Sequence, residues 1–197
     1  MPSLNCMDQA LWAEELAGKL LEVPLPRRWV HVQGVAVRAQ FLAPILGDDA
    51  DLLEAAAWLH DIGYSPEVAD TGFHPLDGAR YLRDVQGTDP MLCRLVGNHS
   101  CAFIEAEERG LDHELAEEFP VADQELSDAL TYCDMTTSPS GYPVSVGARL
   151  AEIRQRYGPS DVVTSFTQKA EPDLLGSVAR ISSRLIAHHS ESWRQVP

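Results

Sequence analysis

Residues 55–64 have the sequence AAAWLHDIGY, an apolar helical segment that ends by placing a histidine beside an aspartate. On a helix, Leu53, Ala56, Ala57 and His60 share one face, so the apolar stripe ends in an imidazole. A polar pair directed into a core needs a partner, and a divalent transition metal suits both imidazole and carboxylate. Taken alone, His60-Asp61 is more often the solvated end of a helix, so other segments have to support a metal site.

Length and composition indicate one globular domain. At 197 residues with 45% hydrophobic content, the chain is long enough for one well-packed core and short for two. We therefore expect a single domain over 1–197, with a central part at about 27–135. The sequence does not start with a basic segment followed by an apolar run, and it contains no apolar run of membrane-spanning length. We therefore expect a cytoplasmic protein with no membrane partner.

The charge and the cysteines limit the classes of partner. A formal net charge of -15 argues against a nucleic acid polymer, because phosphate backbones are bound by clustered cations, whereas a small anionic substrate stays possible. The cysteines show no close pairing and are too few for a disulfide scaffold, so reduced thiols are expected at Cys6, Cys93, Cys101 and Cys133.

Periodicity and helix-stop signals predict an all-α fold. No alternating strand pattern, internal repeat or low-complexity tract is found. Residues 65–73 are expected to form a surface loop and 138–142 a Pro/Gly turn. The predicted helices span 8–21, 27–43, the segment ending in His60-Asp61, 74–85, 90–99, 105–118, 123–135, 144–157 and 171–188.

Several of these helices carry an apolar stripe that leads to a polar side chain. In the second helix, Val30, Gly34, Val37 and Phe41 are expected to form the buried stripe, with His31 on its border. The stripe of helix 90–99 leads to His99, and that of helix 123–135 leads to Asp134. The acidic run 105–118 is predicted to be a solvated face, and helix 171–188 is expected to pack on its own domain, although the sequence leaves the oligomeric state open.

The inward polar residues are best explained together. One such histidine is usually a core residue with a hydrogen-bond partner. Several buried polar side chains need partners at the same time, and one metal site can serve as the partner of all of them. The candidates, in chain order, are His31, His60-Asp61, His74, His99 and Asp134. His113 and the pair His188-His189 have no inward stripe and are predicted to lie on the surface.

This ordered set resembles the HD-domain superfamily of metal-dependent phosphohydrolases. Supporting details are Arg28 one turn before His31, the segment Leu-His-Asp-Ile-Gly at 59–63, and a helix that opens at His74-Pro75. The resemblance covers roughly 27–135 and is specific only when the residues are taken as a set.

The resemblance implies a ligand set. It assigns one metal to His31, His60, Asp61 and Asp134, while His74 and His99 match the two additional histidines of the subgroup with binuclear sites. Asp61 would then bridge both metals. The cofactor implied is a divalent transition metal, expected as two ions of Fe, Mn, Co, Ni or Zn.

The activity implied is hydrolysis of a small phosphorylated compound, most plausibly a nucleotide or dinucleotide. Two ions can bind a water between them, lower its pKa and direct it at phosphorus, without a covalent protein nucleophile. His60 and Asp61 would carry the catalytic metals, and Arg28 could contact a phosphate oxygen bidentately. For Arg80 and Arg83 we prefer a surface role.

Two other functions stay open. Some superfamily members with the same six-residue order hold two irons and oxidise a small polyol or phosphonate with dioxygen. Here residues 100–104 lack the lysine expected for a phosphonate, which lowers this alternative. A regulatory module with a purely structural metal ranks last, because all six ligand positions are filled. Thr136, Thr137 and Tyr142 could face a ligand, but a plain turn explains them equally well.

Overall fold

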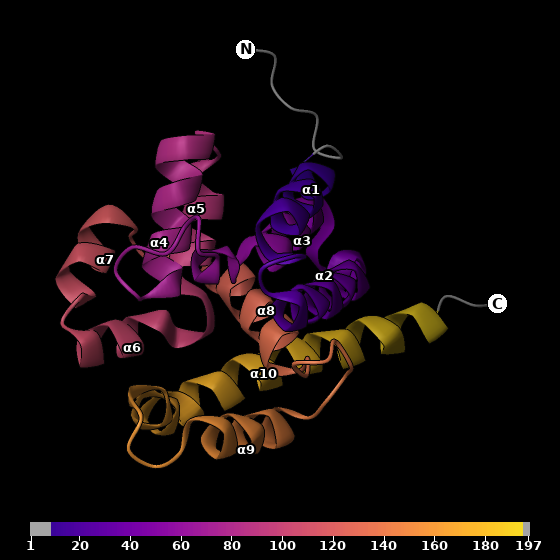
Figure 1. Ribbon diagram of the computed structural model, residues 1–197. Coiled ribbons are helices and arrows are strands. Elements are labelled where there is room, and N and C mark those ends of the chain that lie inside the picture. The colour runs from indigo at the N-terminus through magenta and orange to yellow at the C-terminus, as the bar shows by residue number, and fades with distance from the viewer. Residues whose placement is uncertain (1–8, 195–197) are drawn as a thin grey trace.

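The computed structural model describes residues 9–194, with side chains described for 9–190, and every regular element in this range is helical. Thr137 and Pro143 form an isolated bridge in the turn between two helices. The all-α prediction is confirmed (Figure 1). The α-helices are α1 Gln9–Leu21, α2 Pro26–Leu46, α3 Ala50–Leu59, α4 His74–Tyr81, α5 Pro90–Asn98, α6 Ala102–Arg109, α7 Asp112–Glu118, α8 Gln124–Met135, α9 Val146–Tyr157 and α10 Val162–Arg194.

Helix α3 lies at the centre of the fold. It packs against α1, α2, α5 and α8, and its last five residues are all buried. A helical segment that is apolar on all sides, as these five residues are, is stable only inside a core, where burying its surface contributes about 25 cal/mol per Å². The end of α3 therefore delivers His60 and Asp61 to the interior of the molecule.

Two groups of helices flank this end of α3. In Figure 1, α1, α2 and α3 lie together on one side, and α4, α5, α6 and α7 lie on the other, with α8 between them. Helix α10 runs beneath both groups, and α9 lies along it. Polar side chains from several helices can therefore meet between the two groups.

The helix starts follow from local sequence. The Asp89 carboxylate accepts hydrogen bonds from the amides of Met91 and Leu92 at the start of α5, which also has Pro90 in its first turn. Asp123 caps α8 and Ser145 caps α9 in the same manner. Each cap satisfies amides that have no partner within the helix, which contributes about 1 kcal/mol.

The predicted buried stripe of α2 is wrong. Val30, Val37 and Phe41 are 41%, 63% and 52% exposed, respectively. The helix has apolar residues on two faces, and the buried face includes Ala36 and Ala39, whose small side chains let α2 approach α3 closely. The buried face consists of His31, Val32, Val35, Ala36, Ala39, Leu42 and Leu46, so His31 lies within it rather than on its border.

Three helix boundaries also differ from the prediction. Helix α2 continues through Pro44, and α10 begins before residue 171 and contains Pro172. Both prolines are exposed, and the helix residues before and after each of them are buried in the core, which offsets the one backbone hydrogen bond that a proline removes. The expected helix 105–118 is instead two, α6 and α7, separated at Gly110, whose φ of 69° ends α6 in a left-handed conformation.

Helix α10 packs on its own domain as expected. Leu174, Val178 and Ile181 are buried in the same hydrophobic core as α3 and α8. Arg180 donates two hydrogen bonds to the Asp128 carboxylate of α8, at 2.5 and 2.6 Å, which fixes α10 against α8. None of the helices in the described part of the chain is sufficiently long and apolar to span a bilayer.

Three cysteines lie within the described residues, and all are free thiols. Cys93 and Cys133 are buried, as expected of small core residues, and Cys101 is partly buried. Cys6 lies outside the described residues.

The loop 65–73 is held by one buried carboxylate. Asp77 of α4 accepts hydrogen bonds from the amides of Asp70, Thr71 and Gly72 and from the Thr71 hydroxyl, at 2.7–3.2 Å. This carboxylate is 3% exposed, so these donors replace the water that it loses on folding. The loop leads directly into His74.

Replacing this carboxylate should destabilise the protein. We expect Asp77→Ala to lower the free energy of unfolding by about 3 kcal/mol, because three loop amides lose a charged acceptor. Urea denaturation followed by circular dichroism measures the change. Asp70→Ala is the matched control, since the Asp70 side chain is exposed. Equal effects of the two substitutions would contradict the role given to Asp77.

Candidate functional site

His60 and Asp61 form the centre of the site at the end of α3. The side chain of His60 is 1% exposed, and its Nδ1 donates a hydrogen bond to the Ala57 carbonyl oxygen, 2.8 Å away. A neutral imidazole that donates from Nδ1 has a free lone pair on Nε2. The Nε2 atom of His60 is buried and has no hydrogen-bond partner. An unsatisfied buried acceptor is a position that a metal ion would satisfy.

His31 reaches the same point from α2. Its Nδ1 donates to the Ser138 carbonyl oxygen at 3.0 Å, and its Nε2 lies 3.1 Å from Oδ1 of Asp134. The turn that supplies Ser138 approaches closely, because a Cβ on Gly34 would lie only 2.4 Å from the Gly141 carbonyl oxygen. These two glycines allow the turn to orient the His31 ring.

His74 and His99 meet on the opposite side of Asp61. Their Nε2 atoms are 3.2 Å apart, and Nδ1 of His99 donates to the Val96 carbonyl oxygen at 2.7 Å. Gly63 lets the start of α4 come this near, since a Cβ there would lie 1.9 Å from the His74 carbonyl oxygen. Any side chain at position 63 would displace His74.

Two three-residue groups therefore share one carboxylate. His31, His60 and Asp61 place ligand atoms within 4.8 Å of one another, and so do Asp61, His74 and His99. Oδ2 of Asp61 lies 3.6 Å from Nε2 of His60, while Oδ1 lies 3.4 Å from Nε2 of His74. The two oxygens of Asp61 thus face different groups, as a bridging carboxylate requires.

Asp134 lies next to these groups and outside both of them. It contacts Nε2 of His31, accepts a hydrogen bond from the Ser100 hydroxyl at 2.6 Å, and lies 3.8 Å from the Arg149 guanidinium. Ser100 and Cys101 directly follow His99 with φ values of 49° and 62°, a left-handed conformation that is strained for residues other than glycine. This strained turn brings Ser100 to Asp134.

The charge states of these side chains favour the binding of a cation. Burial raises the pKa of the Asp61 carboxyl, but the adjacent Arg28 guanidinium outweighs burial and holds that pKa well below its usual range. Burial lowers the pKa of His60 to about 4, and it also brings the pKa of His74 well below its usual value. An ionised carboxylate thus lies among unprotonated imidazole nitrogens. This donor set fits a divalent transition metal.

A stack of three side chains closes one side of the site. The Arg28 guanidinium pairs with Asp61 and lies over the ring of Tyr64, 3.4 Å from its centre. The ring of Tyr64 in turn stacks on His74, with ring centres 3.9 Å apart. Sequence reasoning identified Arg28 but missed Tyr64, for which the only signal was its position four residues after His60.

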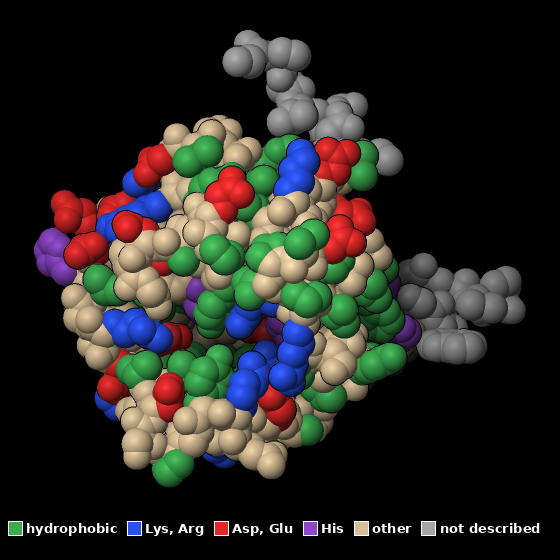
Figure 2. All heavy atoms as spheres, in the orientation of Figure 1, with side chains coloured by type: hydrophobic (Ala, Val, Ile, Leu, Met, Phe, Trp, Pro, Cys, Tyr) green, Lys and Arg blue, Asp and Glu red, His purple; other side chains and the backbone are tan. Residues whose placement is uncertain are grey.

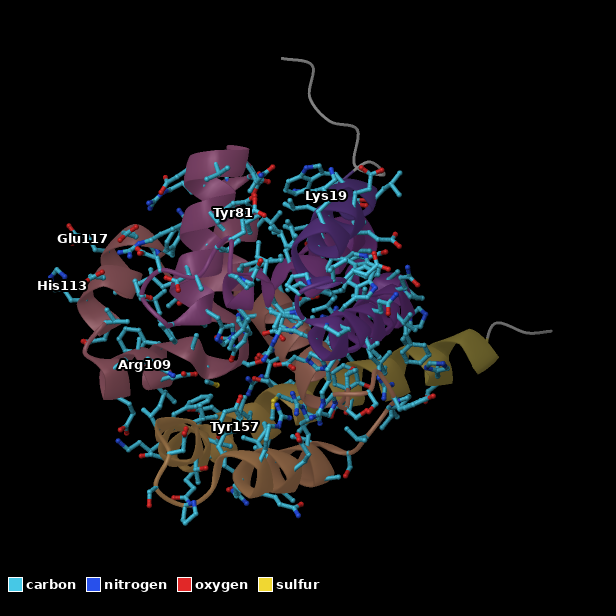
Figure 3. All side chains as sticks on the ribbon, in the orientation of Figure 1. Lys19, Tyr81, Arg109, His113, Glu117 and Tyr157 are labelled. Carbon is cyan, nitrogen blue, oxygen red and sulfur yellow. The ribbon has the colours of Figure 1, made fainter. Side chains whose placement is uncertain are left out.

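The site opens into a cavity of about 90 Å³. Its walls include Arg28 and the metal-site residues His31, Asp61, His74, His99 and Asp134. Arg149, Arg156 and Tyr157 of α9 complete the wall, and Figure 3 shows Tyr157 between α9 and the helices above it. Sequence reasoning also missed these three residues, although Arg149 lies one turn after Val146 on the predicted apolar face of its helix.

Glu105 corrects the prediction that the acidic run is only a solvated face. It is 5% exposed, lines the cavity and pairs with Arg109. The rest of the run does lie outside the site, and Figure 3 shows His113 and Glu117 at the outer edge of α7.

The remaining candidates lie outside the cavity. Arg80 and Arg83 both pair with Glu118 of α7, which gives them a structural role. The hydroxyls of Thr136 and Thr137 donate to carbonyl oxygens of α8, so a plain turn explains them. Tyr142 is 72% exposed, and His113, His188 and His189 line neither the cavity nor the two metal-ligand groups.

The chain matches a known family over its central part. The model of the HD domain matches residues 28–130, which is more than half of the chain and includes every candidate ligand except Asp134. Comparison with curated proteins and with solved structures found no match. The match agrees with the helical fold and with the His/Asp groups that could hold a metal. The chain belongs to the HD domain family, a group made up largely of metal-dependent hydrolases.

Proposed function

We propose that this protein is a metal-dependent phosphohydrolase that acts on a small phosphorylated compound, a nucleotide or dinucleotide, at a site for two metal ions. One observation carries the proposal. His31, His60 and His99 each donate Nδ1 to a backbone carbonyl, so the Nε2 atom of each ring is left to face the other side chains of the site. Such bonds are typical of metal-ligating histidines, because they fix the tautomer and the ring orientation.

Each side chain has a distinct task in this proposal. His31 and His60 would hold one ion and His74 and His99 the other, with Asp61 between them. Asp134 would complete the first ion's ligands, oriented by Ser100. When bound, two ions lower the pKa of a water and stabilise charge on phosphoryl oxygens. Fe, Mn, Co, Ni and Zn all suit this mixture of imidazole and carboxylate.

Arg28 is proposed to bind the reacting phosphate. Its guanidinium lines the cavity and is held in place by Asp61 on one side and Tyr64 on the other. A guanidinium has five N–H donors, so the bond to Asp61 leaves others for a phosphoryl oxygen. In the hydrolysis, the oxygen of water bonds to phosphorus while the ester oxygen departs with a proton.

The acidic surface supports a small substrate rather than a polymer. With a net charge of -15, the chain would repel an extended phosphate backbone, whereas the local positive charge at the cavity can attract one small anion.

The bridging role of Asp61 can be tested by removing its charge. Asp61→Asn keeps the size of the side chain, and we expect it to reduce the bound metal and to lower phosphatase activity on the order of 100-fold or more, since both ions lose a shared anionic ligand. Elemental analysis and phosphate release measure the two effects. Asp70→Asn, at an exposed carboxylate, should change neither. A variant with full metal content and turnover would rule out the site.

The hypothesis of a second metal ion depends on His74 and His99 as its ligands. We expect His99→Ala to lose one ion per chain and to retain the other, because the ligands of the first group stay in place. Elemental analysis of protein purified without oxygen and without added metal gives the count and the element. His113→Ala is the control. An unchanged count in His99→Ala would contradict the second site.

The same metal analysis separates phosphohydrolase from oxygenase. Two irons per chain together with dioxygen consumption would favour the di-iron oxygenase. Manganese, cobalt, nickel or zinc with release of phosphate would favour the hydrolase.

The lowered pKa of His60 predicts how the stability of the metal-free protein depends on pH. Between pH 6.5 and about 4 the unfolded chain binds a proton at His60 that the folded chain does not bind, so folding weakens as the pH falls through this window. At 1.36 kcal/mol per pKa unit, His60 contributes a loss of roughly 3 kcal/mol. Urea denaturation at several pH values measures it. His60→Gln should flatten the curve, His113→Gln should not, and parallel curves for His60→Gln and the native chain would contradict the prediction.

A further inference from the structure

A second chamber adjoins the metal-site cavity. It has a volume of about 320 Å³, compared with about 90 Å³ for the inner cavity. Arg28, His31, Arg149 and Arg156 line both spaces, so the outer chamber continues the inner one. The inner cavity has room for a phosphate-sized group, and the outer chamber has room for the remainder of a small molecule.

The outer chamber is positively charged in an otherwise acidic chain. Four of the 15 Lys and Arg residues line it, namely Arg27, Arg28, Arg149 and Arg156, and its lining contains no carboxylate. Figure 2 shows basic side chains gathered around a hollow above α9 and α10, with histidine visible inside it. Positive charge focused in a cleft raises the local concentration of anions.

Arg149 is a buried cation with an unused donor. The residue is 8% exposed, and its Nε has no hydrogen-bond partner. A buried donor without a partner destabilises the protein, and an anionic ligand that accepts this hydrogen bond would remove that penalty. The same atom is unpaired in Arg38 and Arg154, but of these three arginines only Arg149 lines the two spaces.

Arg156 lies beside Arg149 and shares its counter-ion. Glu152 accepts hydrogen bonds from Arg149 at 2.6 Å and from Nε of Arg156 at 2.8 Å. Glu152 therefore positions both guanidiniums, and Arg149 also lies 3.8 Å from Asp134, a carboxylate that belongs to the metal site. Arg27, which is exposed, forms no ion pair with any described side chain, so it adds an uncompensated positive charge to the chamber.

The apolar part of the chamber comes from three prolines and a leucine. Pro24 and Leu25 precede α2, Pro26 is its first residue, and Pro139 belongs to the turn that orients His31. Rigid apolar walls beside guanidiniums suit an organic spacer that carries an anionic end group. Helix α9, which supplies Arg149 and Arg156, lies beyond the residues matched by the HD domain.

We propose that the outer chamber binds a second phosphate group, so that the substrate carries two phosphates joined by an organic spacer. Arg27 and Arg156 bind the second phosphate, and Arg149 contacts the substrate where the two spaces meet. The inference rests on the proposed phosphohydrolase activity for the reacting phosphate, and it adds the class of substrate: a bisphosphorylated small molecule.

The test compares two nucleotides that differ in one phosphate group. Adenosine 3′,5′-bisphosphate and adenosine 5′-monophosphate are given to the metal-loaded protein, and both phosphate release and binding by calorimetry are measured. We expect the bisphosphate to bind at least tenfold more tightly and to be hydrolysed with a correspondingly higher kcat/KM. In Arg156→Gln this advantage, taken as the ratio of the bisphosphate value to the monophosphate value in the same variant, should fall to within about threefold.

Arg154→Gln is the matched control. Arg154 lies on the same helix but pairs with Glu171 of α10 and does not line either space, so its loss should leave the preference intact. Equal binding of the two nucleotides, no binding of either at millimolar concentration, or an equal loss for both in Arg156→Gln would overturn the second-phosphate site.

Binding separates this inference from the proposed function. If neither nucleotide releases phosphate, the proposed activity fails, yet a tenfold binding preference that disappears in Arg156→Gln would still support the chamber. If phosphate is released from both nucleotides at equal rates and with equal affinity, the activity stands and the chamber fails.

Discussion

The structure depends on keeping one buried carboxylate charged. Asp61 is 4% exposed, and an ionised group at that depth has to be balanced by positive charge or hydrogen-bond donors. Arg28 supplies one partner, but His60, whose Nδ1 donates to a backbone carbonyl, offers Asp61 a lone pair on Nε2 and no donor. The helical fold therefore brings a buried carboxylate next to an imidazole lone pair that no side chain of the site satisfies. A divalent cation suits both groups.

Much of the fold and part of the site could be predicted from apolar stripes that end in a polar side chain. His60, His99 and Asp134 each lie at such an end, and all three are buried in the structure. Periodicity locates the side chain that faces inward, and the chemistry of that side chain then indicates the kind of partner. His31 was identified although the wrong face of α2 was expected to be buried. Because α2 carries apolar residues on two faces, only contact with α3 decides between them.

The residues that were missed act across contacts between segments far apart in the sequence. Tyr64 matters because it lies between Arg28 and His74, and Arg149 matters because α9 folds back toward Asp134. In the sequence, Glu105 looks like the other acidic residues of the run 105–118. Its burial follows from the end of α6 at Gly110 and from its ion pair with Arg109. A single sequence contains no local signal for such contacts, since each side chain is ordinary within its own helix.

The carbonyl groups that orient the histidines have a consequence for sequence variation. His31, His60 and His99 are held by the main chain of Ser138, Ala57 and Val96, and every amino acid provides the same carbonyl oxygen. These hydrogen bonds therefore place no requirement of their own on the side chains at these three positions, where packing alone limits the choice of residue at the buried Ala57 and Val96. A comparison of sequences would not identify these positions as the ones that orient the metal ligands, even where the bonds are retained in every structure.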